Sequence, residues 1–255
     1  MGSIYSLRDV SLELPFGKNY RKILQNIHLD ISAGKIYTIV GASGCGKTSL
    51  LRVMGGLTLA SSGSVSYLSQ SVKSPPPGVA FVFQDYASVL LPWRTVEKNV
   101  SLGIESKLSP AECAKRVKDA IALVRLTGRE SDYPWQLSGG MQQRVQIARA
   151  LATQPSVLLM DEPFAALDAM TKTGLQDELL KLRDQTGASI VFITHDIEEA
   201  IYLGDEVSLM QGPPGAIIER ITIDLPSNKN QLDTRSLPQF LAYRKHIYDA
   251  IEDRK

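Results

Sequence analysis

The sequence predicts an α/β fold built around a parallel sheet, and two kinds of pattern lead to this prediction. Short apolar runs rich in β-branched residues are typical of buried strands, and they occur at 36–40 (IYTIV), 157–160 (VLLM) and 189–194 (SIVFIT). Helical patterns separate these runs, and polar residues follow each of them. Strands that alternate with helices in this way favour a parallel sheet covered by helices.

The clearest predicted helix spans 109–128. Ser109 suits the position before the helix, Pro110 suits its first turn, and Glu112 completes a capping box. An apolar stripe recurs at spacings of three and four residues. Its predicted members are Ala114, Val117, Ile121 and Val124.

Composition and charge exclude several classes of protein. Of the 255 residues, 44% are apolar and 22% are charged, which is ordinary for a globular domain. The formal net charge of +1 gives no basic field that would attract nucleic acid. The two cysteines, Cys45 and Cys113, form no metal-ligand or disulfide pattern. The first residues do not resemble a signal peptide, and no apolar run is long enough to span a bilayer, so we expect any membrane role to be peripheral.

A glycine-rich loop joins a predicted strand to a predicted helix. Residues 41–48 read GASGCGKT, which matches G-x-x-x-x-G-K-[ST] in the strand–loop–helix setting that this motif requires. Its backbone N–H groups and the helix N-terminus can hold phosphates, while Lys47 would reach the β- and γ-phosphates and Thr48 would bind Mg²⁺. The predicted nucleotide-binding residues are Gly41, Ala42, Ser43, Gly44, Cys45, Gly46, Lys47, Thr48 and Ser49.

Two carboxylates follow the strand at 157–160. The segment VLLMDEP (157–163) places Asp161 where it can hold Mg²⁺ and Glu162 where it can orient or deprotonate an attacking water. An Asp-Glu-Pro turn that merely closes a strand is the alternative. The phosphate loop argues against this alternative, because a nucleoside triphosphatase needs a Mg²⁺ carboxylate of this kind.

The octet LSGGMQQR (137–144) narrows the class, because the sequence here resembles the ABC ATPase family. The resemblance implies a P-loop ABC domain that binds ATP and Mg²⁺, with two ATP molecules held at a head-to-tail dimer interface. It implies that the signature motif contacts the ATP of the opposite subunit. The residues implied in that contact are Ser138, Gly139, Gly140 and Gln142.

Further family elements occur in order along the chain. Gln84 matches the glutamine that links Mg²⁺ and the attacking water to the membrane partner, and Asp168 matches an interface aspartate in FAALD (164–168). His195 matches the histidine that contacts the γ-phosphate, so the implied catalytic set is Glu162, His195, Gln84 and Lys47, with Mg²⁺ held by Thr48, Gln84 and Asp161.

The aromatic residue that stacks on adenine in this family is less clearly marked. Phe16, just before Gly17, is the better candidate. Tyr20 is the alternative, and a packing role remains open for both.

Two longer stretches resemble the ATPases of nitrate, sulfonate and taurine importers. They are LLPWRTVEKNVSLGIE (90–105) and THDIEEAIYLGDEVSLMQGPPG (194–215). The resemblance implies an integral membrane permease, a second ATPase copy or paralogue, and an extracytoplasmic binding protein that acts indirectly. The first stretch follows Gln84, so Leu91, Trp93 and Val96 are expected either in a groove that receives the permease or in the core.

We therefore predict a single ABC domain over 1–255, at the cytoplasmic face of the membrane. A β lobe and a RecA-like core are expected at about 1–85 and 151–220, an inserted helical lobe at about 86–150, and a short tail at 221–255. Two alternatives stay open: a soluble regulatory ABC ATPase without a permease, and a nucleotide-binding scaffold without turnover.

Overall fold

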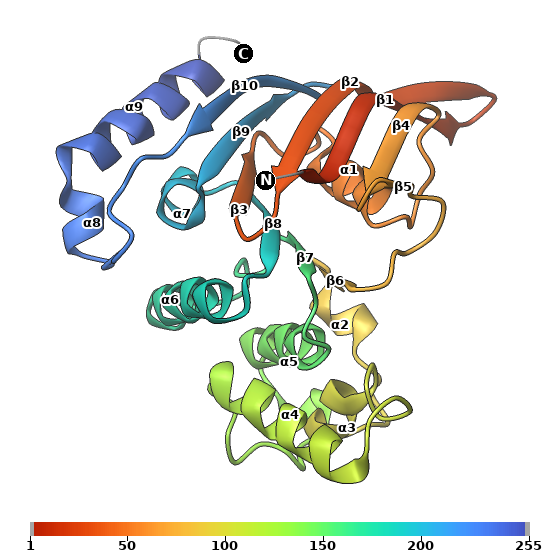
Figure 1. Ribbon diagram of the computed structural model, residues 1–255, viewed down its shortest axis with the longest axis vertical. Helices are drawn as coiled ribbons and strands as arrows, with labels where there is room; N and C mark the ends of the chain where they lie inside the picture. Colours follow the sequence, from red (N-terminus) through yellow and green to blue (C-terminus); the bar gives the residue numbers. More distant parts are fainter. Residues whose placement is uncertain (1–2, 253–255) are drawn as a thin grey trace. The chain divides into compact units, whose positions relative to one another are not determined.

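The computed structural model describes residues 3–252 and divides into two compact units (Figure 1). The first unit comprises Met1–Pro77 and Leu182–Lys255, and the second comprises Gly78–Lys181. These units are defined by contacts and do not share the boundaries of the predicted lobes, which stay a prediction.

The first unit contains an antiparallel sheet with the strand order β2-β1-β4-β5. Two long strands, β1 (Ser3–Phe16) and β2 (Asn19–Ser32), form a hairpin beside β4 (Ser62–Tyr67) and β5 (Gln70–Ser71). The hairpin turns at Gly17, whose φ of 62° lies in the left-handed region that glycine tolerates.

The same unit contains parallel strands centred on β3 (Ile36–Val40), which pairs with β8 (Ser189–Thr194) on one side and β9 (Glu206–Gln211) on the other. An antiparallel strand, β10 (Ala216–Thr222), extends β9. Every residue of β3 and β8 is buried, as expected for parallel strands covered on both faces. The predicted strands at 36–40 and 189–194 are confirmed.

Four helices complete the first unit. They are α1 (Lys47–Met54), α7 (Ile197–Leu203), α8 (Asp233–Ser236) and α9 (Pro238–Glu252). Helix α7 contacts β3, β8 and β9, and the C-terminal helices α8 and α9 contact α7. Among residues 3–252, no helix is both long and apolar enough to cross a membrane.

The second unit is mainly helical. Its strands β6 (Val79–Val82) and β7 (Val157–Asp161) pair in parallel. Helix α5 (Gly139–Ala152) contacts α2 (Tyr86–Val89), α3 (Val96–Ser101), α4 (Pro110–Leu123) and β6. A 3₁₀ turn, η1 (Pro134–Gln136), precedes α5, and α6 (Ala169–Thr186) follows β7.

Helix α4 confirms a helix in the predicted region, but it ends at Leu123 rather than at Gly128, and one member of the predicted apolar stripe is wrong. The side chain of Ser109 accepts the N–H of Glu112, as predicted, but the Glu112 carboxylate accepts a hydrogen bond from Arg116 one turn further on. Ala114 is exposed, so its assignment to the stripe was wrong. The buried positions are Val117, Ala120, Ile121 and Val124, so the predicted face is the buried one, with Ala120 in the stripe and Ala114 outside it.

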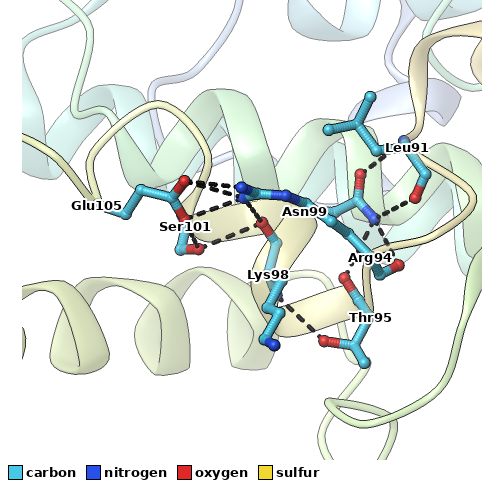
Figure 2. A network of polar contacts seen from close by, with 7 residues as sticks. All are labelled: Leu91, Arg94, Thr95, Lys98, Asn99, Ser101 and Glu105. Atoms are coloured by element: carbon cyan, nitrogen blue, oxygen red, sulfur yellow. Dashed lines mark hydrogen bonds and ion pairs between the residues drawn. The ribbon is translucent and has the colours of Figure 1, made fainter.

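A buried asparagine fixes the loop that precedes α3 (Figure 2). The Asn99 side chain accepts the N–H of Leu91 at 2.9 Å and donates to the carbonyls of Leu91, Arg94 and Thr95 at 2.9–3.1 Å. Arg94 in turn pairs with Glu105 at 3.0 Å. One fully buried amide thus supplies partners to backbone groups that the loop cannot satisfy by itself.

Helix α5 carries two buried glutamines with different surroundings. The Gln143 side chain donates to the carbonyl of Glu162 at 3.2 Å and accepts the N–H of Ala166 at 3.1 Å. The Gln146 side chain is equally buried, yet neither its amide nitrogen nor its oxygen has a hydrogen-bond partner among residues 3–252. An unpartnered buried amide costs free energy, whereas a partnered one stabilises its surroundings.

These surroundings predict opposite effects of one substitution. Gln146→Met should raise the free energy of unfolding by about 1–3 kcal/mol, because a buried amide without partners is replaced by an apolar chain of similar length. Gln143→Met should lower it by a similar amount, because two backbone groups lose their partners. Thermal and urea unfolding of both variants test this prediction, and a loss of stability at both positions would contradict it.

Candidate functional site

In the first unit, the phosphate loop connects a fully buried strand to a helix. Strand β3 ends at Val40, the loop spans 41–46, and α1 begins at Lys47. The Lys47 ammonium is buried and donates to the carbonyls of Gly41 at 2.7 Å and Ala42 at 3.1 Å, so the side chain folds back over the loop. Gly46 precedes the helix with φ of 104°, a conformation that a residue with a Cβ atom rarely adopts.

The predicted nucleotide-binding residues divide into those facing solvent and those facing the protein. Ala42, Ser43 and Gly44 are exposed, and Thr48 and Ser49 are half-buried. Cys45 is buried, and that burial raises the pKa of its thiol, so the thiol packs rather than reacts. The outer part of the loop and the positive end of α1 therefore remain open to an anion.

The turn between β9 and β10 supports the inner side of this loop. A Cβ atom on Gly41 would lie 2.1 Å from the carbonyl oxygen of Met210, and one on Gly215 would lie 2.1 Å from the carbonyl oxygen of Cys45. Gly215 also exchanges backbone hydrogen bonds with β2, donating to Ile23 at 2.7 Å and accepting from Gln25 at 2.9 Å. The support that Gly215 gives the phosphate loop was not predicted. The only local signal for it in the sequence is the turn composition of QGPPG (211–215).

His195 follows the C-terminal end of β8, next to the end of β3 where the phosphate loop begins. Val40 pairs with Thr194 in the parallel register of β3 and β8, so Gly41 and His195 each come one residue after a paired position. His195 is exposed, and the Asp196 N–H donates to the hydroxyl of Thr194 at 3.0 Å. The structure therefore places the histidine and the phosphate loop on neighbouring strand ends.

The two adenine-stacking candidates lie at the tip of the β1–β2 hairpin. Phe16 is 67% exposed and Tyr20 is 72% exposed, so neither ring packs in the core. The Arg21 guanidinium carbon lies over the Phe16 ring, 5.9 Å from its centre. The exposed fraction of the two rings does not decide which of them would stack on adenine.

The second unit carries the acidic strand end. Asp161 ends β7 and is 2% exposed, while Glu162 is half-buried. The Gln84 amide donates to the Glu162 carboxylate at 3.3 Å, so two residues that were predicted to act on the attacking water are in contact. Glu162 has φ of 45°, a left-handed conformation that costs a residue of this kind roughly 1–3 kcal/mol.

Gln143 was not predicted as part of this site. Its side chain bonds the Glu162 carbonyl and the Ala166 N–H, and so it fixes the backbone on both sides of Pro163. The sequence gives no separate signal for it, because Gln143 lies between two other polar residues, Gln142 and Arg144. Gln143 is thus a positioning residue for Glu162.

The signature motif begins α5. The Ser138 side chain caps the helix by accepting the N–H of Met141 at 3.3 Å. A Cβ atom on Gly139 would lie 2.5 Å from the Tyr86 hydroxyl, and one on Gly140 would lie 3.1 Å from the Ala166 carbonyl, so both positions require close approach. Ser138 is exposed at the positive end of the helix, where an anion is favoured.

Two other implied residues have local partners. The Gln142 amide nitrogen donates to the carbonyls of Pro134 at 2.8 Å and Leu137 at 3.2 Å, so its oxygen is the atom left for a ligand, as an acceptor rather than a phosphate donor. Asp168 is exposed, and hydrogen bonds from Thr171 lower the pKa of its carboxyl.

The family model described as ABC transporter matches residues 24–165. The chain belongs to the ABC transporter family. It is an ABC ATPase that binds and hydrolyses ATP, and the predicted class and α/β P-loop fold are confirmed. An ATP-binding cassette solved as a dimer in a post-hydrolysis state, bound to ADP and Pi, superimposes with a TM-score of 0.79 at 31% identity, covering 86% of this chain and 99% of that one.

Among the relatives, an uncharacterized ABC transporter ATP-binding protein of Methanocaldococcus jannaschii is 46% identical, covering 93% of this chain and 87% of that protein. An aliphatic sulfonates import ATP-binding protein of Bacillus subtilis is 41% identical, covering 90% and 87%. A taurine import ATP-binding protein of Escherichia coli is 38% identical, covering 91% and 92%. The predicted resemblance to importer ATPases is confirmed at the level of the subfamily.

The support under the phosphate loop yields a prediction. Gly215→Ala places a methyl group against the Cys45 carbonyl and should displace the loop, lowering ATP affinity by roughly tenfold, or about 1.4 kcal/mol. Equilibrium binding of a fluorescent ATP analogue measures the change.

Gly187→Ala is the matched control. Gly187 has φ of 66°, and nothing lies within 4 Å of its Cβ position, so this substitution strains the backbone without touching the loop. Equal losses of ATP affinity in the two variants would contradict the supporting role of Gly215.

Proposed function

We propose that this chain is the ATP-hydrolysing subunit of a membrane importer for a small anion such as nitrate, a sulfonate or taurine. In this proposal it acts peripherally at the cytoplasmic face of the membrane. It works with a second copy or a paralogue, with an integral permease, and indirectly with an extracytoplasmic binding protein. Nucleic acid has no part in it.

The observation that carries the importer proposal is the near full-length similarity to import ATP-binding proteins. The sulfonate and taurine relatives are 41% and 38% identical, and the chain covers most of each. Substrate choice would belong to the permease and binding protein, so the anion class rests on the relatives and not on a pocket in this chain.

In the proposed catalytic cycle, the phosphate loop and the N-terminus of α1 hold the ATP phosphates. Lys47 leaves its carbonyl partners for the β- and γ-phosphates, and Phe16 or Tyr20 stacks on adenine. Thr48, Asp161 and Gln84 offer oxygen atoms, the donor type that Mg²⁺ prefers, and Mg²⁺ there would neutralise phosphate charge.

Glu162 would accept the proton of the attacking water, and Gln84 would keep the carboxylate oriented through the 3.3 Å hydrogen bond. His195 would contact the γ-phosphate from its neighbouring strand end. Ser138, Gly139 and Gly140 of one copy would bind the ATP of the other, with Gln142 as an acceptor and Asp168 at the interface. Closure of the two copies around ATP then drives the permease, and hydrolysis reopens them.

The loop fixed by Asn99 supplies the proposed permease contact. Trp93 is 70% exposed on this loop, Leu91 is half-buried, and Val96 is fully buried in the helical part of the second unit. Val96 therefore belongs to the core, and the proposed apolar contact consists of Trp93 and the exposed part of Leu91. A large aromatic side chain on an ordered loop loses little entropy on docking.

Substitution of Glu162 tests its proposed role as the base. Glu162→Gln keeps the shape of the side chain and removes its basicity, so ATP binding should persist while hydrolysis falls by roughly 10²–10⁴. Phosphate release and nucleotide binding measure the two properties. Turnover near the wild-type rate would exclude Glu162 as the base.

Copurification tests the proposed contact with an integral permease. Tagged Glu162→Gln protein with ATP should copurify an integral permease from native membranes. Adding Trp93→Ala should abolish this capture without changing ATP binding, because Trp93 is outside the core.

Trp135→Ala is the matched control, since Trp135 is 71% exposed and lies in the same unit. Capture of a self-dimer alone by the parent variant would favour the soluble regulatory ATPase. Capture that survives Trp93→Ala would reject Trp93 as the contact.

A further inference from the structure

The C-terminal arm, residues 229–252, contacts α7 at both of its ends. At the C-terminal end of the helix, Lys229 donates to the carbonyl of Tyr202 at 2.7 Å and that of Gly204 at 3.5 Å. Carbonyls in the last turn of a helix have no acceptor role within the helix itself and are commonly bonded from outside it. Burial lowers the pKa of Lys229 to about 8, an effect that Asp205 and Asp184 oppose and Arg183 reinforces.

Near the N-terminal end of α7, one carboxylate bridges two guanidinium groups of the arm. Glu198 accepts from Arg235 at 2.8 Å and from Arg244 at 2.9 Å. The Arg235 guanidinium carbon also lies 5.1 Å from the Tyr202 ring centre and 5.9 Å from that of Phe240, which is fully buried. The arm therefore packs against α7 through a stacked cation as well as through the ion pairs.

The N-terminal end of α7 is continuous with the histidine loop. The Asp196 carboxylate caps the helix by accepting the N–H groups of Glu198 at 2.9 Å and Glu199 at 3.2 Å. The hydroxyl of Thr194 donates to the buried carboxylate of Glu199 and accepts the N–H of Asp196. His195 lies between these bonded residues, so a shift of α7 moves the backbone that carries it.

We infer that the C-terminal arm positions His195 for hydrolysis by holding α7 in place, with Glu198, Arg235 and Arg244 as positioning residues. None of these hydrogen bonds and ion pairs joins the arm to the phosphate loop. The arm would act on His195 through the first turn of α7. This inference rests on the proposed role of His195. It adds a determinant of the rate that lies outside the nucleotide-binding motifs.

The expected change in rate requires only a small change in free energy. Exposed ion pairs contribute little to folding stability, and a threefold to tenfold change in rate corresponds to about 0.7–1.4 kcal/mol. Two pairs on one carboxylate, assisted by the stacking of Arg235, can therefore alter turnover without determining whether the unit folds.

The test measures ATP hydrolysis by the full-length chain in five variants: Glu198→Gln, Arg244→Ala, their combination, His195→Ala and Arg8→Ala. Glu198→Gln and Arg244→Ala are called the arm variants because each breaks the contact between the arm and α7, and each should lower kcat by roughly threefold to tenfold. The KM for ATP and the ADP affinity should stay unchanged, and the thermal midpoint should fall no further in Arg244→Ala than in Arg8→Ala. The combined variant should be no slower than Glu198→Gln, because Glu198→Gln already breaks the ion pair that Arg244→Ala removes.

Arg8→Ala is the control for loss of a surface ion pair. Arg8 pairs with Asp30 at 2.8 Å in the antiparallel sheet, and its side chain is 51% exposed, close to the 49% of Arg244. Its kcat should equal that of the wild type. An equal fall in Arg8→Ala, or wild-type kcat in both arm variants, would overturn the inference.

His195→Ala separates failure of the inference from failure of the proposed function. If His195→Ala abolishes turnover while the arm variants remain fast, only the inference fails. If His195→Ala turns over at the wild-type rate, the proposed role of His195 fails, and the inference fails with it.

Discussion

The pairing of β3 with a parallel strand on each side is the constraint on which the first unit depends. Five consecutive buried residues fix where this strand ends, and the strand end fixes where the phosphate loop begins. The same pairing places His195 one residue beyond the partner of Val40 and places Met210 beneath Gly41. The backbone that would meet a phosphate is therefore aligned by sheet hydrogen bonds before any ligand arrives.

Much of this arrangement could be predicted because its signals are local. The apolar run at 36–40 and the glycines that follow it identify a strand, a loop and a helix without any knowledge of distant residues. The signature octet likewise begins a helix that Ser138 caps. Where the outcome depended on tertiary packing, the sequence was ambiguous. Spacing identified α4 and three of its buried residues, but it could not show where along the helix burial begins, so Ala114 was wrongly included in the stripe.

The residues that were missed share a different property, since each acts on backbone far away in the sequence. Gly215 is needed because a carbonyl of the phosphate loop lies against it, and Gln143 because it bonds the backbone around Glu162. Neither requirement appears in periodicity or composition. Asn99 is similar, since only the folded loop shows that its amide replaces backbone partners.

Glu162 illustrates a conflict between stability and chemistry. Its left-handed backbone is a conformation that glycine or asparagine would adopt at lower cost. Replacing Glu162 by either residue would therefore relieve backbone strain but would lose the carboxylate in contact with Gln84. At position 162 a gain in stability would thus remove the group that is proposed to act as the base.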